Sequence, residues 1–185
     1  MLFVISGVSS SGKNTVMKEL IKRVKNLKVL SKSSGTTRSP RESDKEFDTY
    51  VYLTKPEFEK GIKEGKFFEY ELVHENMYGL LKERIETAVN STTDDYIRDV
   101  EVKGNVTLRN AYKDKIVSIF IDAPNEVLRE RLINRGDKLE DIELRLSRSE
   151  LERSYKSHYD IVIENIDLEK TLQTIENFIE KVRNN

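Results

Sequence analysis

Short runs of consecutive apolar residues alternate with helical patterns along this chain. Residues 2–5 (LFVI) and 116–121 (IVSIFI) are continuous runs of the kind that lie buried on both faces of a parallel sheet, and residues 161–163 (IVI) are a third. Residues 96–102 are a weaker candidate strand because charges interrupt them. Strands that alternate with helices predict an α/β fold with parallel pairing and right-handed crossovers.

Two stretches have the apolar spacing of amphipathic helices. Val16, Leu20 and Val24 recur at i, i+4 and i+8 directly after a Ser/Gly segment. The last stretch has one apolar stripe, formed by Leu168, Leu172, Ile175, Ile179 and Val182. The first run, the Ser/Gly segment and the first helix therefore predict the strand–loop–helix opening of an α/β domain.

Two further segments interrupt this alternation. Residues 33–90 hold short alternating runs such as 50–53, followed by helical pieces at 56–65 and 81–89, which predicts an insert of short strands and helices. Residues 124–146 are rich in Arg and Glu and offer little to bury. We expect a second insert in this segment.

Composition excludes several classes of function. Thirty-two basic and 33 acidic residues give a net charge of −1, so no global field favours nucleic acid or an anionic membrane. The chain has no cysteine, which excludes disulfides, thiolate metal sites and a cysteine nucleophile, and His74 and His158 lie too far apart for a zinc motif. The apolar start, residues 1–6, is too short for a signal peptide. We expect a cytoplasmic protein without membrane or nucleic-acid partners, as a monomer or weak homo-oligomer.

The Ser/Gly segment has the spacing of a phosphate-binding loop. Residues 7–15 read GVSSSGKNT, which fits G-x-x-x-x-G-K between a buried strand and a helix. The backbone N–H groups of such a loop converge on a phosphate, and the helix N-terminus adds positive potential. Gly7 and Gly12 permit close approach, and Lys13 can reach the β- and γ-phosphates. Asn14 stands where Ser or Thr is usual, so Thr15 can supply the hydroxyl.

Further motifs resemble those of the guanylate kinase family, in order and at family-like spacing from the first strand to the last helix. They are Ser34-Gly35-Thr36-Thr37-Arg38-Ser39-Pro40-Arg41 (S-x-T-T-R-x-P-R), Tyr50, Phe67-Phe68-Glu69, Tyr78-Gly79, Asp99-Val100-Glu101-Val102-Lys103-Gly104 (D-hydrophobic-D-x-x-G), Arg131-Leu132-Ile133-Asn134-Arg135-Gly136 (R-L-x-x-R-G) and Arg145-Leu146. The resemblance implies a P-loop three-layer α/β fold with a central parallel sheet. It also implies an enzyme that uses MgATP to phosphorylate GMP.

The resemblance divides the single kinase domain into a core, an acceptor insert and a lid. The core is residues 1–32, 92–124 and 147–185, the mixed α/β GMP-binding insert is 33–91, and the helical lid is 125–146. The residues implied to hold GMP are Ser34, Arg38, Arg41, Tyr50, Glu69, Tyr78, Asp99 and Glu101. Glu69 would accept hydrogen bonds from guanine N1–H and the 2-amino group, a pair that adenine cannot present. Asp99 and Glu101 alternate along the candidate strand and would share a face.

On the donor side, the resemblance implies that ATP is held by Gly7, Ser9, Ser10, Ser11, Gly12, Lys13, Asn14 and Thr15. Mg²⁺ would arrive with ATP, near Thr15 and Asp99, without direct protein ligands. The implied catalytic residues are Lys13, Arg38, Arg131, Arg135 and Arg145. Arg131 and Arg135 are i, i+4 on a helix face, and Arg145 lies at a further helical offset. An alternative is that these arginines form surface ion pairs with Glu126, Glu130 and Glu140.

Several positions depart from the family pattern. Leu80 replaces the Ser or Thr that follows Tyr-Gly, Val8 and Ser10 replace the Pro and Gly of the loop, and Glu101 replaces an aspartate. Asp44 stands near the family's glutamate of P-R-x-G-E. Two alternatives stay open: a nucleoside monophosphate kinase with another acceptor base, which Leu80 would allow, and a catalytically weak guanylate-kinase-like binding module, against which the intact Lys13 argues.

Overall fold

The computed structural model describes residues 1–73 and 75–184, with the backbone alone at Ser43; His74 and Asn185 lie outside the described residues. The chain forms two compact units. The larger combines Phe3–Leu27 with Ile97–Asn185, and the smaller combines Met1–Leu2 with Lys28–Tyr96. Among the described residues, no helix is long and apolar enough to cross a membrane.

The five-stranded sheet has the order β2-β7-β1-β8-β9. Its strands are β1 (Leu2–Gly7), β2 (Leu27–Val29), β7 (Asp95–Asp99), β8 (Ile116–Asp122) and β9 (Ile161–Glu164). Every residue of β1 and β8 is buried, and β8 pairs in parallel with β9. The buried apolar runs thus form a central parallel sheet, which confirms the predicted α/β fold class.

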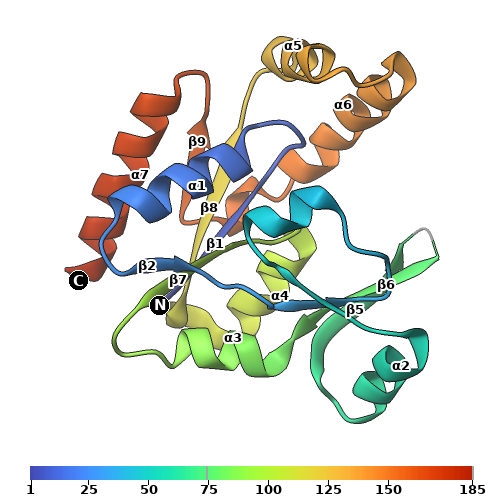
Figure 1. Cartoon of the computed structure of the whole chain (residues 1–185). Helices are drawn as coiled ribbons and strands as arrows, with labels where there is room; N and C mark the ends of the chain where they lie inside the picture. Colours follow the sequence, from blue (N-terminus) through green and yellow to red (C-terminus); the bar gives the residue numbers. More distant parts are fainter. Residues whose placement is uncertain (74, 185) are drawn as a thin grey trace. The chain divides into compact units, whose positions relative to one another are not determined.

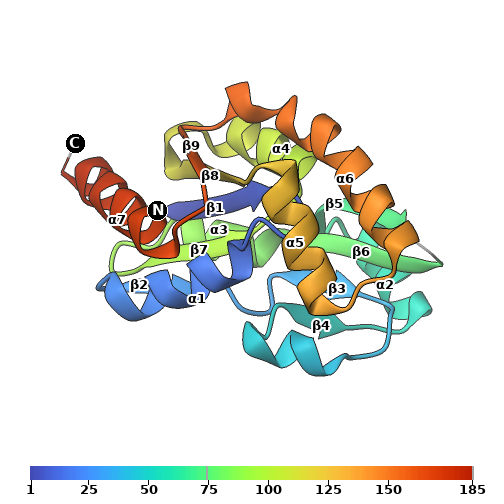
Figure 2. The same cartoon turned by 90° about the horizontal axis from the view of Figure 1, so that it is seen from above.

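Helices cover this sheet in the larger unit. They are α1 (Lys13–Arg23), α4 (Val102–Tyr112), α5 (Asn125–Arg135), α6 (Leu139–Arg153) and α7 (Leu168–Arg183), with 3₁₀ turns at Lys113–Lys115 and Lys156–His158. Helix α1 packs beside α7 and α4 packs on β8, so that α1 and α7 lie on one face of the sheet and α4 on the other (Figures 1 and 2). The first and last predicted helices are confirmed.

The candidate strand at 96–102 is shorter than its sequence pattern suggests. Strand β7 ends at Asp99, and Glu101 is the N-cap residue of α4. The prediction that Asp99 and Glu101 alternate along one strand is therefore wrong. The strand pattern ends here because the carbonyl of Glu101 already accepts the first hydrogen bond of α4, from the Asn105 N–H at 3.0 Å.

The expectation that residues 124–146 have little to bury is also wrong. Leu128 and Leu132 of α5 and Ile142 and Leu146 of α6 join one apolar cluster with Val8, Val102, Phe120 and Ala123. In both helices the buried apolar pair is spaced i, i+4, which makes one narrow buried stripe, while many of the remaining positions are charged.

The two helices of this segment are separate. Gly136 ends α5 in the left-handed region at φ 85°, and α6 begins at Leu139. Arg145 therefore lies on a different helix from Arg131 and Arg135. Helix α6 continues to Arg153, so the expected boundary after residue 146 falls inside a helix.

The smaller unit is built on a four-stranded sheet of order β4-β3-β6-β5. The strands are β3 (Ser34–Thr36), β4 (Tyr50–Tyr52), β5 (Phe67–Val73) and β6 (Asn76–Leu81), and the helical elements are a 3₁₀ helix (Glu42–Glu46), α2 (Lys55–Lys63) and α3 (Lys82–Val89). Strand β3 pairs in parallel with β4 and antiparallel with β6, which pairs antiparallel with β5. Helix α2 starts at a capping box between Thr54 and Glu57.

One part of this unit is packed around Phe67. Its ring stacks on Phe58 of α2, with centroids 4.2 Å apart and an interplanar angle of 15°. A Cβ atom at Gly35, Gly61 or Gly79 would approach the Phe67 ring to within 2.9, 2.8 or 2.7 Å, respectively. Because glycine has no side chain, these three positions leave space for the Phe58–Phe67 pair, which packs α2 against β3 and β6.

Candidate active site

The loop between β1 and α1 has the geometry of an anion cradle. Gly7 has φ 143°, and a Cβ there would lie 1.9 Å from the Ile121 carbonyl oxygen. Gly12, at φ 93°, directly precedes α1 and has no side chain to cap the helix. The first backbone N–H groups of α1 are therefore open to a ligand. Ser10 adopts the left-handed region at φ 64°, which is uncommon for a residue other than glycine. This is the position at which the family pattern has glycine.

Lys13 is folded back onto its own loop. Its Nζ donates to the carbonyl oxygens of Gly7 at 2.7 Å and Val8 at 3.0 Å. Burial lowers the pKa of Lys13, while the carboxylates of Glu152, Glu101 and Asp99 act in the opposite direction. The predicted pair Asp99 and Glu101 is thus close enough to Lys13 to act on its charge, although only Asp99 belongs to a strand.

Asn165 and Arg131 hold the loop backbone through hydrogen bonds to the Ser11 carbonyl oxygen. The sequence motifs pointed to Arg131 but not to Asn165. The Asn165 side-chain amide donates to the Ser11 carbonyl at 2.7 Å, and Arg131 donates to the Asn165 carbonyl at 2.7 Å and to the Ser11 carbonyl at 3.1 Å. Asn165 follows β9, at the strand end where α/β sheets bind ligands, and that position is the signal that points to it.

A pocket of about 500 Å³ opens beside the loop. It brings together most of the predicted donor-site residues with two predicted lid arginines, and its lining is Ser10, Gly12, Lys13, Asn14, Thr15, Arg131, Arg135, Asn165, Ile166 and Leu168. Ile166 and Leu168 are exposed apolar side chains at this pocket. Among the described residues, the buried hydroxyls of Ser10 and Ser11 have no hydrogen-bond partner. Basic, amide, hydroxyl and apolar groups in one hollow suit a nucleotide.

Arg135 and Arg145 meet at Asp137, between α5 and α6. Arg135 Nε donates to Asp137 Oδ1 at 2.7 Å and a second nitrogen contacts Oδ2, and Arg145 Nε lies 3.3 Å from Oδ2. The Arg135 hydrogen bonds hold the pKa of Asp137 below its usual range. Within the described part of the chain, these two arginines pair with Asp137 and not with the alternative partners Glu126, Glu130 and Glu140.

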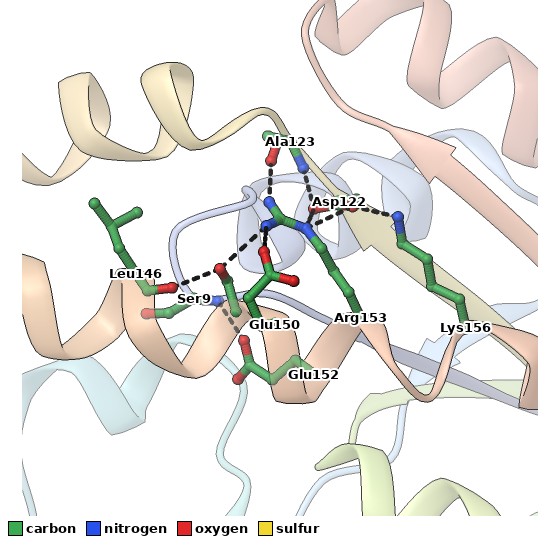
Figure 3. A network of polar contacts seen from close by, with 9 residues as sticks. Ser9, Asp122, Ala123, Leu146, Glu150, Glu152, Arg153 and Lys156 are labelled. Carbon is green, nitrogen blue, oxygen red and sulfur yellow. Dashed lines mark hydrogen bonds and ion pairs between the residues drawn. The ribbon is translucent and has the colours of Figure 1, made fainter.

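Helix α6 reaches the loop through Ser9. Arg145 Nη1 donates to the Ser9 hydroxyl at 3.1 Å. The Ser9 backbone N–H donates to Glu152 Oε2 at 3.3 Å (Figure 3). Burial raises the pKa of Glu152, and Lys13 opposes this rise. No sequence pattern pointed to Glu152 as a site residue, because a glutamate in a highly charged helix is ordinarily a solvated surface side chain.

The residues near the loop fit a Mg²⁺ ion carried by ATP better than a metal cage made of protein alone. Thr15 is exposed at the start of α1, and the carboxylate of the half-buried Asp99 acts electrostatically on Lys13. Across the described part of the chain, no group of three or more His, Cys, Asp or Glu side chains is placed to hold a metal. Mg²⁺ prefers few carboxylates together with phosphates and water, so this donor set is suitable.

In the smaller unit, three predicted acceptor residues share one face of the four-stranded sheet. Ser34 is paired with Tyr50 on one side and with Leu80 on the other, and Thr36 is paired with Tyr78. Directly paired residues, and residues two apart along a strand, point to the same face. Ser34, Tyr50, Tyr78 and Leu80 therefore point the same way, and Leu80 adds a buried apolar side chain to that face.

Arg38 is held by Asp44 in a buried two-point ion pair. Its Nη1 lies 2.7 Å from Oδ2 and its Nη2 2.6 Å from Oδ1, and its guanidinium sits 4.9 Å from the centroid of the Tyr50 ring. Asp44 also accepts hydrogen bonds from the Arg41 N–H at 2.7 Å and the Tyr52 hydroxyl at 2.7 Å. The hydrogen bonds from Arg38 are the main reason why the pKa of Asp44 lies well below its usual range.

Two predicted acceptor residues are less enclosed. Arg41 is exposed. Glu69 is half-buried on β5, where the pairing with β6 shifts register between Phe67 and Tyr70. A bulge of this kind re-aims a side chain, and such irregularities occur beside active sites.

The chain is similar to guanylate kinases in both sequence and structure. The sequence model of the family described as guanylate kinase matches residues 1–182. The guanylate kinase of Wolinella succinogenes is 37% identical over 92% of this chain and 79% of its own length, and that of Rickettsia felis is 36% identical over 97% and 92%. The crystal structure of guanylate kinase from Anaplasma phagocytophilum superimposes with a TM-score of 0.71 at 26% identity, covering 98% of this chain and 85% of that one.

Proposed function

The chain belongs to the guanylate kinase family and is an enzyme that phosphorylates GMP with ATP; on this premise, we propose how its own residues divide the work. The pocket that joins the loop, Lys13, Arg131 and Arg135 is the observation that supports the proposal most strongly.

On the donor side, the loop amides and Lys13 bind the ATP phosphates. Ser10, whose buried hydroxyl has no partner among the described residues, lines the same hollow as the exposed residues Asn14 and Thr15. The apolar side chains of Ile166 and Leu168 suit the adenine ring. Thr15 and Asp99 would lie near a Mg²⁺ ion bound with ATP, and that ion would supply charge neutralisation at the phosphate oxygens.

On the acceptor side, Arg38 binds the phosphate of GMP with Ser34, Arg41 and Tyr50. Arg38 is pre-oriented for this role, because Asp44 and the Tyr50 ring fix its guanidinium plane. Arg41 is exposed and can turn toward the same dianion. Tyr78 and the register-shifted Glu69 read the guanine, and Asp99 and Glu101 orient the acceptor.

The reaction is a direct in-line transfer in which a GMP phosphate oxygen attacks the γ-phosphorus of ATP. No general base is needed, because that oxygen is already ionised near neutral pH. Arg131, Arg135 and Arg145 stabilise the charge on the transferring group as the lid, residues 125–146, closes and excludes water. Most of the rate acceleration therefore comes from positioning and electrostatics.

The presence of leucine at position 80 bears on which acceptor base the enzyme binds. It lies on the sheet face of Ser34 and Tyr78, where a Ser or Thr would offer a hydroxyl. We keep GMP as the acceptor because the carboxylate of Glu69 matches the N1–H and 2-amino donors of guanine. The enzyme acts on small molecules in the cytoplasm, as a monomer or weak homo-oligomer, and its net charge of −1 offers no general attraction to nucleic acid or an anionic membrane.

A coupled ADP-release assay with MgATP and each of GMP, dGMP, AMP, UMP and CMP tests this proposal. We expect turnover with GMP that Lys13→Ala abolishes, while the control Lys22→Ala, an exposed lysine of the same helix paired with Glu19, keeps it. Turnover with a different base would mean that Glu69 does not read guanine here. A folded protein that binds ATP but phosphorylates none of the five would contradict the proposed roles.

A further inference from the structure

Glu152 contacts the phosphate loop, yet the mechanism above gives it no role. Its Oε2 accepts a hydrogen bond from the backbone N–H of Ser9 at 3.3 Å (Figure 3). Burial lowers the pKa of Lys13, and Glu152 opposes this effect more strongly than Glu101 or Asp99. A loop amide and the loop lysine are the groups that such loops offer to a phosphate oxygen. A carboxylate of the protein therefore lies where an anion of the substrate is expected.

The position of Glu152 is fixed independently of Ser9. The next residue, Arg153, lies with Nε 3.1 Å from both carboxylate oxygens of Asp122, and it donates to the Ala123 carbonyl at 2.9 Å. Lys156 adds a contact of 2.6 Å to the same carboxylate (Figure 3). Asp122 is the last residue of the buried strand β8 and is itself buried. The end of α6 is thus tied to the sheet, and Glu152 with it.

The same helix holds the other polar group of Ser9. Arg145 precedes Glu152 by seven residues, which is close to two helical turns and puts both side chains on one face of α6. Its Nη1 donates to the Ser9 hydroxyl at 3.1 Å. Helix α6 therefore binds the loop at two points of one residue, the N–H through Glu152 and the hydroxyl through Arg145.

We propose that Glu152 is a positioning residue that occupies part of the anion site of the loop in the nucleotide-free enzyme, and that a phosphate group of the bound nucleotide displaces it from the Ser9 N–H. This inference rests on the proposed ATP role of the loop. In the empty loop, Glu152 satisfies a polar backbone group and offsets the charge of Lys13. In the loaded loop, it is a like charge next to phosphate oxygens, so it weakens nucleotide binding and helps release it.

The test compares Glu152→Gln with Glu152→Asp, measuring MgATP affinity by calorimetry and steady-state kinetics with GMP. The glutamine has nearly the same shape without the charge, so we expect the Kd and the KM for MgATP to fall about 5-fold with kcat unchanged within about 2-fold. The aspartate keeps the charge, and its affinity should stay within about 2-fold of the wild type. Glu150→Gln removes an exposed carboxylate two residues away and should change neither value.

Weaker or unchanged MgATP affinity in Glu152→Gln would overturn the proposal, and so would equal tightening in both Glu152 variants, since side-chain length would then be the cause. If Glu152→Gln does not fold, the Ser9 amide resonance of the wild type decides: it must shift when MgADP binds, and a resonance that stays in place contradicts displacement. A wild type that neither binds MgATP nor phosphorylates GMP would refute the proposed function itself, whatever the Glu152 variants do.

Discussion

Asp44 holds Arg38 by both oxygens, with nitrogen–oxygen distances of 2.7 and 2.6 Å, and both side chains are almost enclosed, at 11% and 8% exposure. A guanidinium in this arrangement keeps one orientation before any ligand arrives. It also depends on its partner, because a buried charge that loses its counter-ion is costly.

Asp44→Asn should therefore destabilise the protein by about 3 kcal/mol and raise the KM for GMP about 10-fold, with a smaller effect on the KM for ATP. Urea unfolding and steady-state kinetics measure the two effects. Asp48→Asn is the matched control, since Asp48 makes an exposed pair with Lys32 in the same segment. An increase in both KM values by the same factor would show that Arg38 does not act on the acceptor.

The same ion pair predicts a pH dependence. The Arg38 hydrogen bonds depress the pKa of Asp44 in the folded protein, so the unfolded chain binds the proton more readily. The stabilisation is complete above the unfolded pKa of about 3.9 and is lost as the pH falls toward the folded value. Between about pH 5 and pH 2, the wild type should lose more unfolding free energy than Asp44→Asn. Parallel curves for the two proteins would contradict this, because all other carboxylates are common to both.

Gly7 should tolerate no side chain. Gly7→Ala places a Cβ 1.9 Å from the Ile121 carbonyl, so we expect a loss of more than about 3 kcal/mol or no folded protein. Gly65 is a suitable control, because it also has a positive φ, at 67°, but nothing lies within 4 Å of its added Cβ. Gly65→Ala should cost only about 1 kcal/mol in thermal unfolding. Similar costs for the two variants would mean that the loop moves away from β8.

Leu80 offers a direct test of the acceptor face. Leu80→Thr should lower stability by about 2 kcal/mol, because the side chain is buried, and reduce the KM for GMP about 5-fold by adding a hydroxyl beside Ser34. Leu81→Thr puts the same hydroxyl on the opposite face of β6 and should leave that KM unchanged. If neither variant alters the KM for GMP, the base does not reach this position.

The anchor of α6 predicts a large difference between two acidic partners of Arg153. Burial alone would raise the pKa of Asp122, but the hydrogen bonds from Arg153 and Lys156 outweigh it and the pKa is lowered. Asp122→Asn leaves both cations with a neutral partner, and we expect a loss of about 3 kcal/mol. Glu150→Gln breaks an exposed contact to the same arginine and should cost less than about 0.5 kcal/mol. Equal shifts in melting temperature would show that Asp122 is no anchor.

Local patterns were sufficient to predict the framework of the donor site. The run 2–5, the loop spacing and the i, i+4 apolar positions of the first helix each have a short-range physical cause, and all three elements form as expected. Arg131 and Arg135, which the motif order singled out as lid arginines, line the hollow beside Lys13, while their catalytic role stays a prediction.

What the sequence did not reveal depends on contacts between distant residues. Ser9 and Glu152 are 143 positions apart, and Ser11 and Asn165 are 154 apart, so no periodicity or spacing rule connects them. The end of β7 before Glu101 was missed because alternation of apolar and charged residues fits a strand and a strand–helix turn alike. In α5 and α6 the charged residues outnumber the buried apolar pairs, so an apolar stripe only one residue wide is hard to recognise in the sequence.

Val8, a residue of the phosphate loop, belongs to the same apolar cluster as Leu128, Leu132, Ile142 and Leu146. The segment 125–146 is consequently not an exchangeable module. A chimera that received this segment from a relative would inherit foreign side chains facing Val8, and the misfit would be transmitted to the backbone of the loop. Recombination within this family should therefore succeed more often when position 8 and residues 125–146 come from the same parent.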